Sequence, residues 1–163
     1  MKIQRSLVVL CSVLILPLLI TTVLQGGQKK KPKNDVCAAN PPASLATCGS
    51  ATAACEVDIK RREGDFASAT PVMVGAKTNQ PFSVKVGTTI TFKSTSKNTG
   101  FVLDFGTSSP FDSGTSIMGG ADRPVSVVAK KAGCYTYSVG ACTAGTIYGM
   151  CGEDAAQFVV SAN

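Results

Sequence analysis

The sequence contains no histidine. Without an imidazole, the chain cannot build a Ser–His or Cys–His nucleophilic pair. It also has no Cys-x-x-Cys pair of the kind that structural zinc sites use, and no glycine-rich motif that would cradle a phosphate. Serine and lysine are both frequent, but no Ser–Lys pair is marked out. We therefore expect no enzymatic activity.

Carboxylates are few and scattered, and no cluster suggests acid–base chemistry or a resident cofactor. We expect them on loops or on the outer faces of strands, in contact with water. A calcium-binding loop near Asp112 or Glu153 stays open as an alternative. The carboxylates in question are Asp104, Asp112, Asp122, Glu153 and Asp154.

The net charge of +6 comes entirely from the N-terminal segment. From Asn34 onward the chain has ten Lys or Arg and ten Asp or Glu, and aromatic residues make up only 6% of the sequence. A nucleic-acid surface needs a basic face on the folded domain. We therefore exclude nucleic acid as a partner.

A long apolar run occurs only once, from Ser6 to Leu24. These 19 residues would span about 28 Å as a helix, close to the thickness of a bilayer core. No small-x-small cleavage site follows them. We expect residues 1–27 to be a retained membrane anchor, with membrane lipid as a partner. A cleaved signal segment, and hence a secreted protein, is the alternative.

Six cysteines follow this run, namely Cys37, Cys48, Cys55, Cys134, Cys142 and Cys151. An even number of cysteines beyond a hydrophobic leader is typical of a disulfide framework in an oxidising compartment. We therefore expect the domain in the periplasm or the extracellular space.

A lysine cluster, Lys29, Lys30, Lys31 and Lys33, opposes this orientation, because basic segments favour the cytoplasmic side. We give the cysteines more weight. The cluster is then predicted to lie just outside the bilayer, against anionic headgroups or acidic loops of a partner. A solvated linker is an equal alternative.

Alternating apolar and polar residues predict an all-β domain over residues 56–163, preceded by a basic, cysteine-rich extension over residues 28–55. Short strands separated by turns are typical of an antiparallel sandwich. Within the extension, residues 44–55 suggest one short helical turn. Residues 106–122 are expected to be a long loop. The expected strands are 56–60, 70–74, 82–86, 90–92, 101–105, 125–129, 135–139 and 157–161.

Two stretches resemble the cupredoxin family, the plastocyanin-like blue-copper proteins. The family ends with a G-x-Y-x-[FY]-x-C strand, a loop and G-M-x-G, and here Gly133-Cys134-Tyr135-Thr136-Tyr137 and Gly149-Met150-Cys151-Gly152 match. Upstream, F-S-V-K-V-G-T-T-I-T-F-K is similar to the family's V-x-x-G-x-x-V-x-F. The resemblance covers residues 70–161 and implies a cupredoxin-like Greek-key β-sandwich.

The copper ligands of the family are absent. The resemblance places Phe101 and Cys142 at the two histidine positions, Val139 at the cysteine and Met150 at the methionine. A blue-copper site needs two imidazoles and a thiolate, so no type-1 copper is expected. Phe101 and Val139 are predicted to fill the vacated space with hydrocarbon. Met150 is expected to fill core space, and Cu(I) held by Met150 and free thiols is the alternative.

Disulfide pairing is partly constrained by counting, since three cysteines lie in the extension and three near the C-terminus. If all six pair, at least one bond must join the two groups. Cys142 and Cys151 flank one loop, so we expect them to pair. Cys134 alternates with the tyrosines and should face outward, where the extension can reach it. We expect Cys55–Cys134 and, by remainder, Cys37–Cys48.

These features together predict a non-catalytic, metal-free protein that is tethered to a membrane. Because cupredoxins commonly dock on redox membrane complexes, the resemblance implies a structural or docking subunit of a larger assembly, such as a respiratory or photosynthetic complex. The alternative is an anchored or secreted binding module for a small ligand, Cu(I) or a cell-envelope component.

Overall fold

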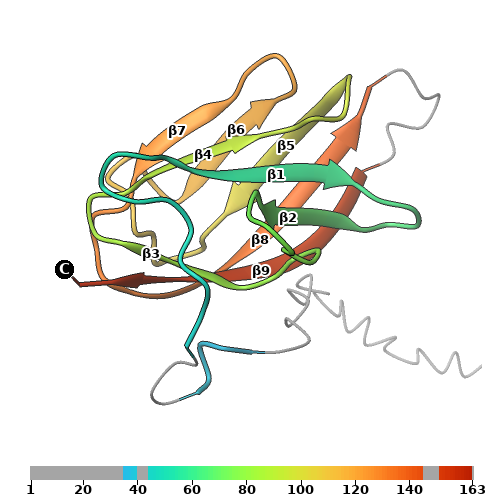
Figure 1. Cartoon of the computed structure of the whole chain (residues 1–163). Coiled ribbons are helices and arrows are strands. Elements are labelled where there is room, and N and C mark those ends of the chain that lie inside the picture. Colours follow the sequence, from blue (N-terminus) through green and yellow to red (C-terminus); the bar gives the residue numbers. More distant parts are fainter. Residues whose placement is uncertain (1–34, 40–43, 145–150, 163) are drawn as a thin grey trace, which may run out of the picture.

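The computed structural model describes residues 35–39, 44–144 and 151–162. Within them the strands form two sheets packed face to face, of order β2-β1-β4-β7 and β3-β9-β8-β5-β6 (Figure 1). No helix occurs in these ranges, so the all-β prediction is confirmed at the level of a β-sandwich. The strands are β1 (Cys55–Arg61), β2 (Ala67–Pro71), β3 (Phe82–Lys85), β4 (Thr89–Lys93), β5 (Thr99–Asp104), β6 (Ser116–Gly120), β7 (Val125–Val128), β8 (Gly133–Thr143) and β9 (Cys151–Ser161).

Both sheets are mixed, so the expectation of a purely antiparallel sandwich was wrong. β1 pairs in parallel with β4, and β3 pairs in parallel with β9. The cause is the path of the chain. After the β1–β2 hairpin the chain crosses to the second sheet as β3, and it returns as β4 beside β1. Alternation identifies a buried face but not the direction of a neighbouring strand.

Aromatic rings fill the space between the sheets. Phe82 stacks on Phe158 with ring centroids 5.3 Å apart, and Phe105 stacks on Tyr137 at 4.9 Å. Phe111 packs edge-on against Phe105. These rings come from the five-stranded sheet and from the loop after β5. Ring burial of this size is the main source of stability in so small a core.

Several strands differ from the sequence prediction, and β8 runs over 133–143 rather than the predicted 135–139. β2 lies at 67–71 rather than 70–74, because its short Ala and Ser residues give no clear alternation. β9 starts at Cys151, six residues earlier than the predicted 157, because it pairs with β8 along its whole length. Part of the expected loop at 106–122 is in fact β6, which pairs with β5. Its glycines suggested a turn, but a Cβ at Gly119 would lie 2.5 Å from the Phe101 ring.

The extension contacts the sandwich in two places, at the edge strand β3 and in the core. Residues 44–54 form no helical turn, contrary to expectation. Instead the extension pairs with the edge strand β3, since Ser83 N donates to Ala46 O at 2.9 Å and Cys48 N donates to Ser83 O at 2.8 Å. Cys48 then enters the core beside Cys55. The extension therefore covers an edge that would otherwise present unpaired backbone groups.

Candidate functional site

Two of the four positions that the resemblance assigns to copper ligands are occupied by core hydrocarbon. Phe101 lies on β5 and Val139 on the neighbouring β8, and only 5% and 0% of their surfaces are exposed. Each contributes about 1.5–3 kcal/mol of burial. The prediction that these two side chains are packed as apolar filler agrees with their burial.

Cys142 does not join Phe101 and Val139. It is exposed on β8, whereas Val139 and Ala141 point into the core, because Cys142 lies at the opposite parity of the strand. Its sulfur is bonded to Cys151, so no free thiolate remains for a metal. Met150 lies outside the described residues. Among those described, no three His, Cys, Asp or Glu side chains are grouped so that they could hold a metal ion.

The cysteines form three disulfides: Cys37–Cys134, Cys48–Cys55 and Cys142–Cys151. The Cys142–Cys151 pair is confirmed, and so is the requirement that one bond join the extension to the C-terminal region. The expected Cys55–Cys134 and Cys37–Cys48 pairs were wrong. Cys55 is buried between the sheets, whereas Cys134 is only half-buried and alternates with the core-facing Tyr135, so the two sulfurs lie on opposite faces.

The predicted membrane-surface lysines and the apolar run lie outside the described residues. They are Lys29, Lys30, Lys31 and Lys33, with residues 1–27 before them. Within the described part of the chain, no helix has the length and hydropathy needed to cross a bilayer. The anchor therefore stays a prediction.

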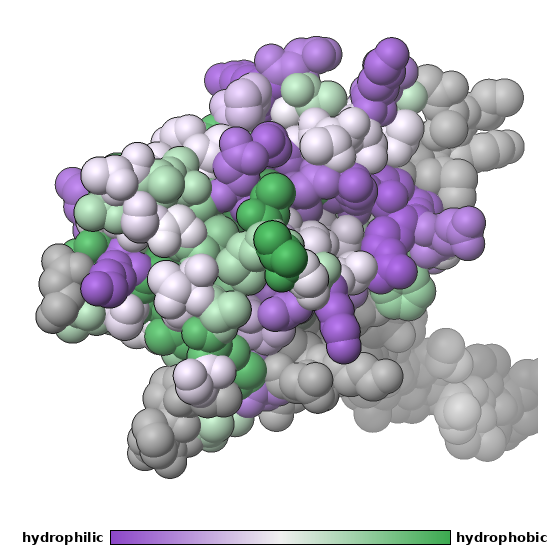
Figure 2. Space-filling view, viewed as in Figure 1, coloured by the Kyte–Doolittle hydropathy of each residue, from purple (hydrophilic) through white to green (hydrophobic). Residues whose placement is uncertain are grey.

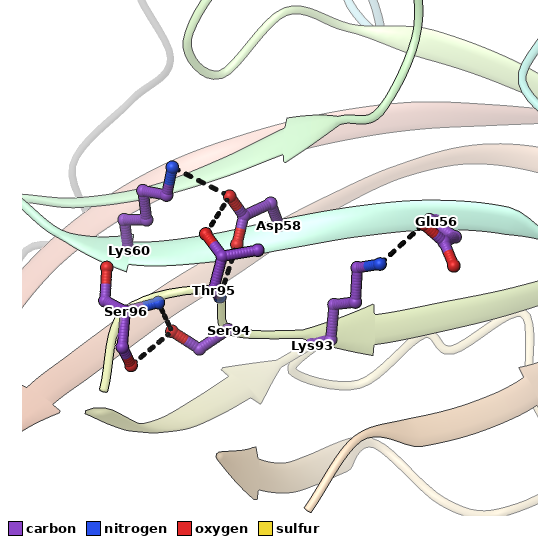
Figure 3. Close-up of polar contacts among 7 residues, drawn as sticks. All are labelled: Glu56, Asp58, Lys60, Lys93, Ser94, Thr95 and Ser96. Carbon is purple, nitrogen blue, oxygen red and sulfur yellow. Dashed lines mark hydrogen bonds and ion pairs between the residues drawn. The ribbon is translucent and has the colours of Figure 1, made fainter. Parts of the chain in front are cut away.

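The outer face of the four-stranded sheet carries paired charges (Figure 3). Lys93 Nζ lies 2.6 Å from Glu56 Oε2, and Lys60 Nζ lies 2.9 Å from Asp58 Oδ2. Asp58 also accepts hydrogen bonds from the backbone and hydroxyl of Thr95. These contacts hold both carboxylates against the outer face of the sheet.

The remaining carboxylates are likewise not clustered. Lys130 lies 2.6 Å from Asp112, and its hydrogen bond and charge lower the pKa of that exposed carboxyl. Asp104 accepts a hydrogen bond from Gly106 N, which caps the turn after β5. Glu153 is exposed on β9. In these placements the carboxylates are paired, cap a turn or face solvent.

A groove of about 690 Å³ lies beside β9. One wall is the loop from Gly75 to Pro81, and the other is Asp154 to Gln157 with Arg62 at the rim. Asn79 ties the walls together, since its Oδ1 accepts from Ala69 N at 2.7 Å and its Nδ2 donates to Asp154 Oδ2 at 2.9 Å. The lining of the groove is about equally polar and apolar, and its walls are held in place.

Gln157 forms a buried polar junction at the groove. Its side chain is on the outer face of the five-stranded sheet, yet the residue is only 2% exposed because the start of the extension covers it. Nε2 donates to Asp35 Oδ1 at 2.6 Å and to Thr136 Oγ1 at 2.8 Å, and Oε1 accepts from Val36 N at 2.9 Å. With the nearby Cys37–Cys134 bond, this junction fixes the extension to the domain.

The loop between β2 and β3 carries an apolar surface that the sequence prediction missed. Val72 and Val74 are exposed, Val74 completely so, and Met73 packs partly against the core. We call Val72, Met73 and Val74 the apolar turn. Strongly apolar atoms stand out near the middle of the face in Figure 2, where Figure 1 places this loop. The expected strand at 70–74 concealed it, because a strand would have buried alternate residues.

The fold and these contacts define a disulfide-linked β-sandwich with a filled apolar core. No family model, no curated protein and no solved structure matches the chain.

Proposed function

We propose that this protein is a metal-free, cupredoxin-like domain tethered to a membrane, with the domain on the extracytoplasmic side. It serves as a structural or docking subunit of a larger membrane assembly, such as a respiratory or photosynthetic complex. The observation that carries the proposal is the hydrocarbon at the ligand positions: Phe101 and Val139 are core residues, and the Cys142 sulfur is bonded to Cys151. A domain filled in this way offers its surface rather than a reactive centre.

Two further observations support the proposal. The order of the long strand β8, a loop and the final strand β9 agrees with the C-terminal arrangement that the cupredoxin resemblance implies. Three disulfides fit a domain outside the reducing cytoplasm. The finer cupredoxin Greek-key arrangement is part of this proposal.

Co-purification tests the docking role. The full-length chain is extracted from the membranes of its source cells in mild detergent, and its native mass is measured. A docking subunit stays with a complex of fixed stoichiometry, whereas recovery of the chain alone would refute the assembly role. Intact mass in the same sample tests the anchor, because loss of about 25 residues (a signal peptide's length) would show that the leader is cleaved.

Copper addition tests the metal-free part of the proposal. We expect no stoichiometric copper by metal analysis and no intense visible absorption, because a blue-copper band requires a thiolate–copper bond. An intense band near roughly 600 nm, of the kind that thiolate-bound type-1 copper gives, would refute it.

A further inference from the structure

We propose that the apolar turn (Val72, Met73 and Val74) is a lipid-contact site that seats the domain against the bilayer holding its N-terminal anchor. This inference rests on the membrane tether of the proposed function. Beyond the tether, it specifies which face of the domain contacts the membrane, and it names the interfacial region of the lipid as the ligand.

The turn projects apolar side chains into solvent. Ala76 N donates to Met73 O at 3.2 Å, which closes a tight turn with Val74 at its tip and Gly75 at φ +73°. A Cβ added at Gly75 would meet no atom within 4 Å, so the tip stands clear of the rest of the domain. Val72 N donates to Glu56 O at 2.8 Å and fixes the base of the turn to β1.

The turn is also held rigidly from its other end. Gln80 N donates to Lys77 O at 3.0 Å, and Gln80 Oε1 accepts from Lys77 N at 2.8 Å. Asn79 then binds both Ala69 N and Asp154. Because the loop is fixed at both ends, its exposed valines lose little backbone freedom on insertion.

The route of the chain brings this part of the surface toward the membrane. The chain enters the described structure at Asp35, which is bonded to Gln157, and Gln157 lines the groove whose opposite wall begins at Gly75, next to the turn. Only residues 25–34 separate the end of the apolar run from Asp35. Ten residues reach at most about 33–36 Å, so this part of the domain cannot leave the neighbourhood of the bilayer.

Lipid fits the turn better than a protein partner does. A stable protein interface buries about 800 Å² on each side, far more than three side chains at one tip provide. A tethered domain needs less, because the anchor already supplies a high effective concentration at the surface. Arg62 and Lys77 are exposed on the adjoining groove rim, where they can meet anionic headgroups.

Tryptophan fluorescence tests the site, because the chain contains no tryptophan. Val74→Trp is made in the full-length chain and placed in phosphatidylcholine–phosphatidylglycerol vesicles, with and without bromine on the acyl chains. Since Val74 is fully exposed, the substitution leaves the core intact. The matched control is Met118→Trp. Met118 is 70% exposed and lies on β6, which is at the opposite edge of the five-stranded sheet from β3.

We expect Val74→Trp to give blue-shifted emission that brominated lipid quenches, and Met118→Trp to show neither effect. Vesicle flotation of the same samples separates the two proposals. If the chain floats but Val74→Trp is not quenched, the lipid site is wrong and the tether stands. A blue shift without quenching would mean that a second copy covers the turn, which also overturns the lipid site. A chain that does not float refutes the tether and, with it, the lipid site.

Discussion

Gly152, at the start of β9, lies directly beneath the backbone of Phe66, and a Cβ on Gly152 would overlap the Phe66 carbonyl. Close by, Glu153 N donates to Asp65 O at 3.1 Å. The β1–β2 hairpin thus presses against the second sheet at a point where only glycine fits.

Substitution of this glycine should therefore destabilise the sandwich. We expect Gly152→Ala to lower the free energy of unfolding by about 1–3 kcal/mol, the usual cost of forcing an extra methyl group into a packed site. Gly100→Ala is the control, because its Cβ would lie 3.9 Å from the nearest atom, Gly119 O. Urea denaturation of both variants measures the difference, and equal stabilities would contradict the packing.

Tyr137 is a core phenol whose hydroxyl has no hydrogen-bond partner among the described residues. An unsatisfied buried polar group costs about 1–3 kcal/mol, so Tyr137→Phe should raise the free energy of unfolding by about 1 kcal/mol. Tyr135→Phe is the opposite case, because Tyr135 Oη donates to Lys131 O at 2.9 Å. In thermal denaturation, the Tm of Tyr137→Phe should lie above that of the parent chain, and the Tm of Tyr135→Phe should lie below it. The reverse order would show that the Tyr137 hydroxyl is satisfied.

Alkaline pH should destabilise the protein through the same side chain. Burial raises the pKa of Tyr137 above its ordinary value of 10.0. Below about pH 10 the phenol is protonated in both states, so its contribution is fully present. As pH rises above that value, the unfolded chain releases the proton and the folded chain keeps it, and stability falls by about 1.4 kcal/mol per pH unit. Unfolding free energies from pH 8 to 11 should fall less steeply for Tyr137→Phe, and identical slopes would rule out this cause.

The long-range disulfide should matter more than the local one. Cys37–Cys134 closes a separation of 97 residues and Cys142–Cys151 one of 9. On the chain-entropy model their removal costs about 4.7 and about 2.6 kcal/mol, respectively. Double Cys→Ala variants at each pair provide the comparison, since neither pair is deeply buried. Equal losses of stability would indicate that the native contacts of the extension, not loop closure, dominate.

Much of the sandwich was predictable, because a strand with one buried face shows its period in the sequence. The alternation around Phe82, Ile90 and Tyr135 located β3, β4 and β8. It also placed Cys134 opposite the core-facing tyrosines, where the extension does reach it. The alternation of apolar residues does not show whether a neighbouring strand is parallel. It also misses strands such as β6, where Gly119 leaves room for the Phe101 ring of the next strand.

The candidate site was predictable only in part. The burial of Phe101 and Val139 followed from their strands, but Cys142 turned out to lie on the other face. Nothing local marked Gln157 as buried, because the residues that cover it come from more than 120 positions away, at separations of 121 and 122. The exposure of the apolar turn was also missed, because valine-rich segments ordinarily indicate the interior of a strand.

The Cys37–Cys134 bond also determines how the domain bears load. A pull on the N-terminal linker passes from Cys37 through the two sulfur atoms to Cys134, at the start of β8. Residues 38–133 form a closed covalent loop off that path and carry no tension. The force enters at the inner strand β8, whose pairing with β9 is the longest ladder among the described residues. The described part of the extension after Cys37, with β1 and β2, is thereby protected from being peeled away one hydrogen bond at a time when the N-terminal linker is pulled.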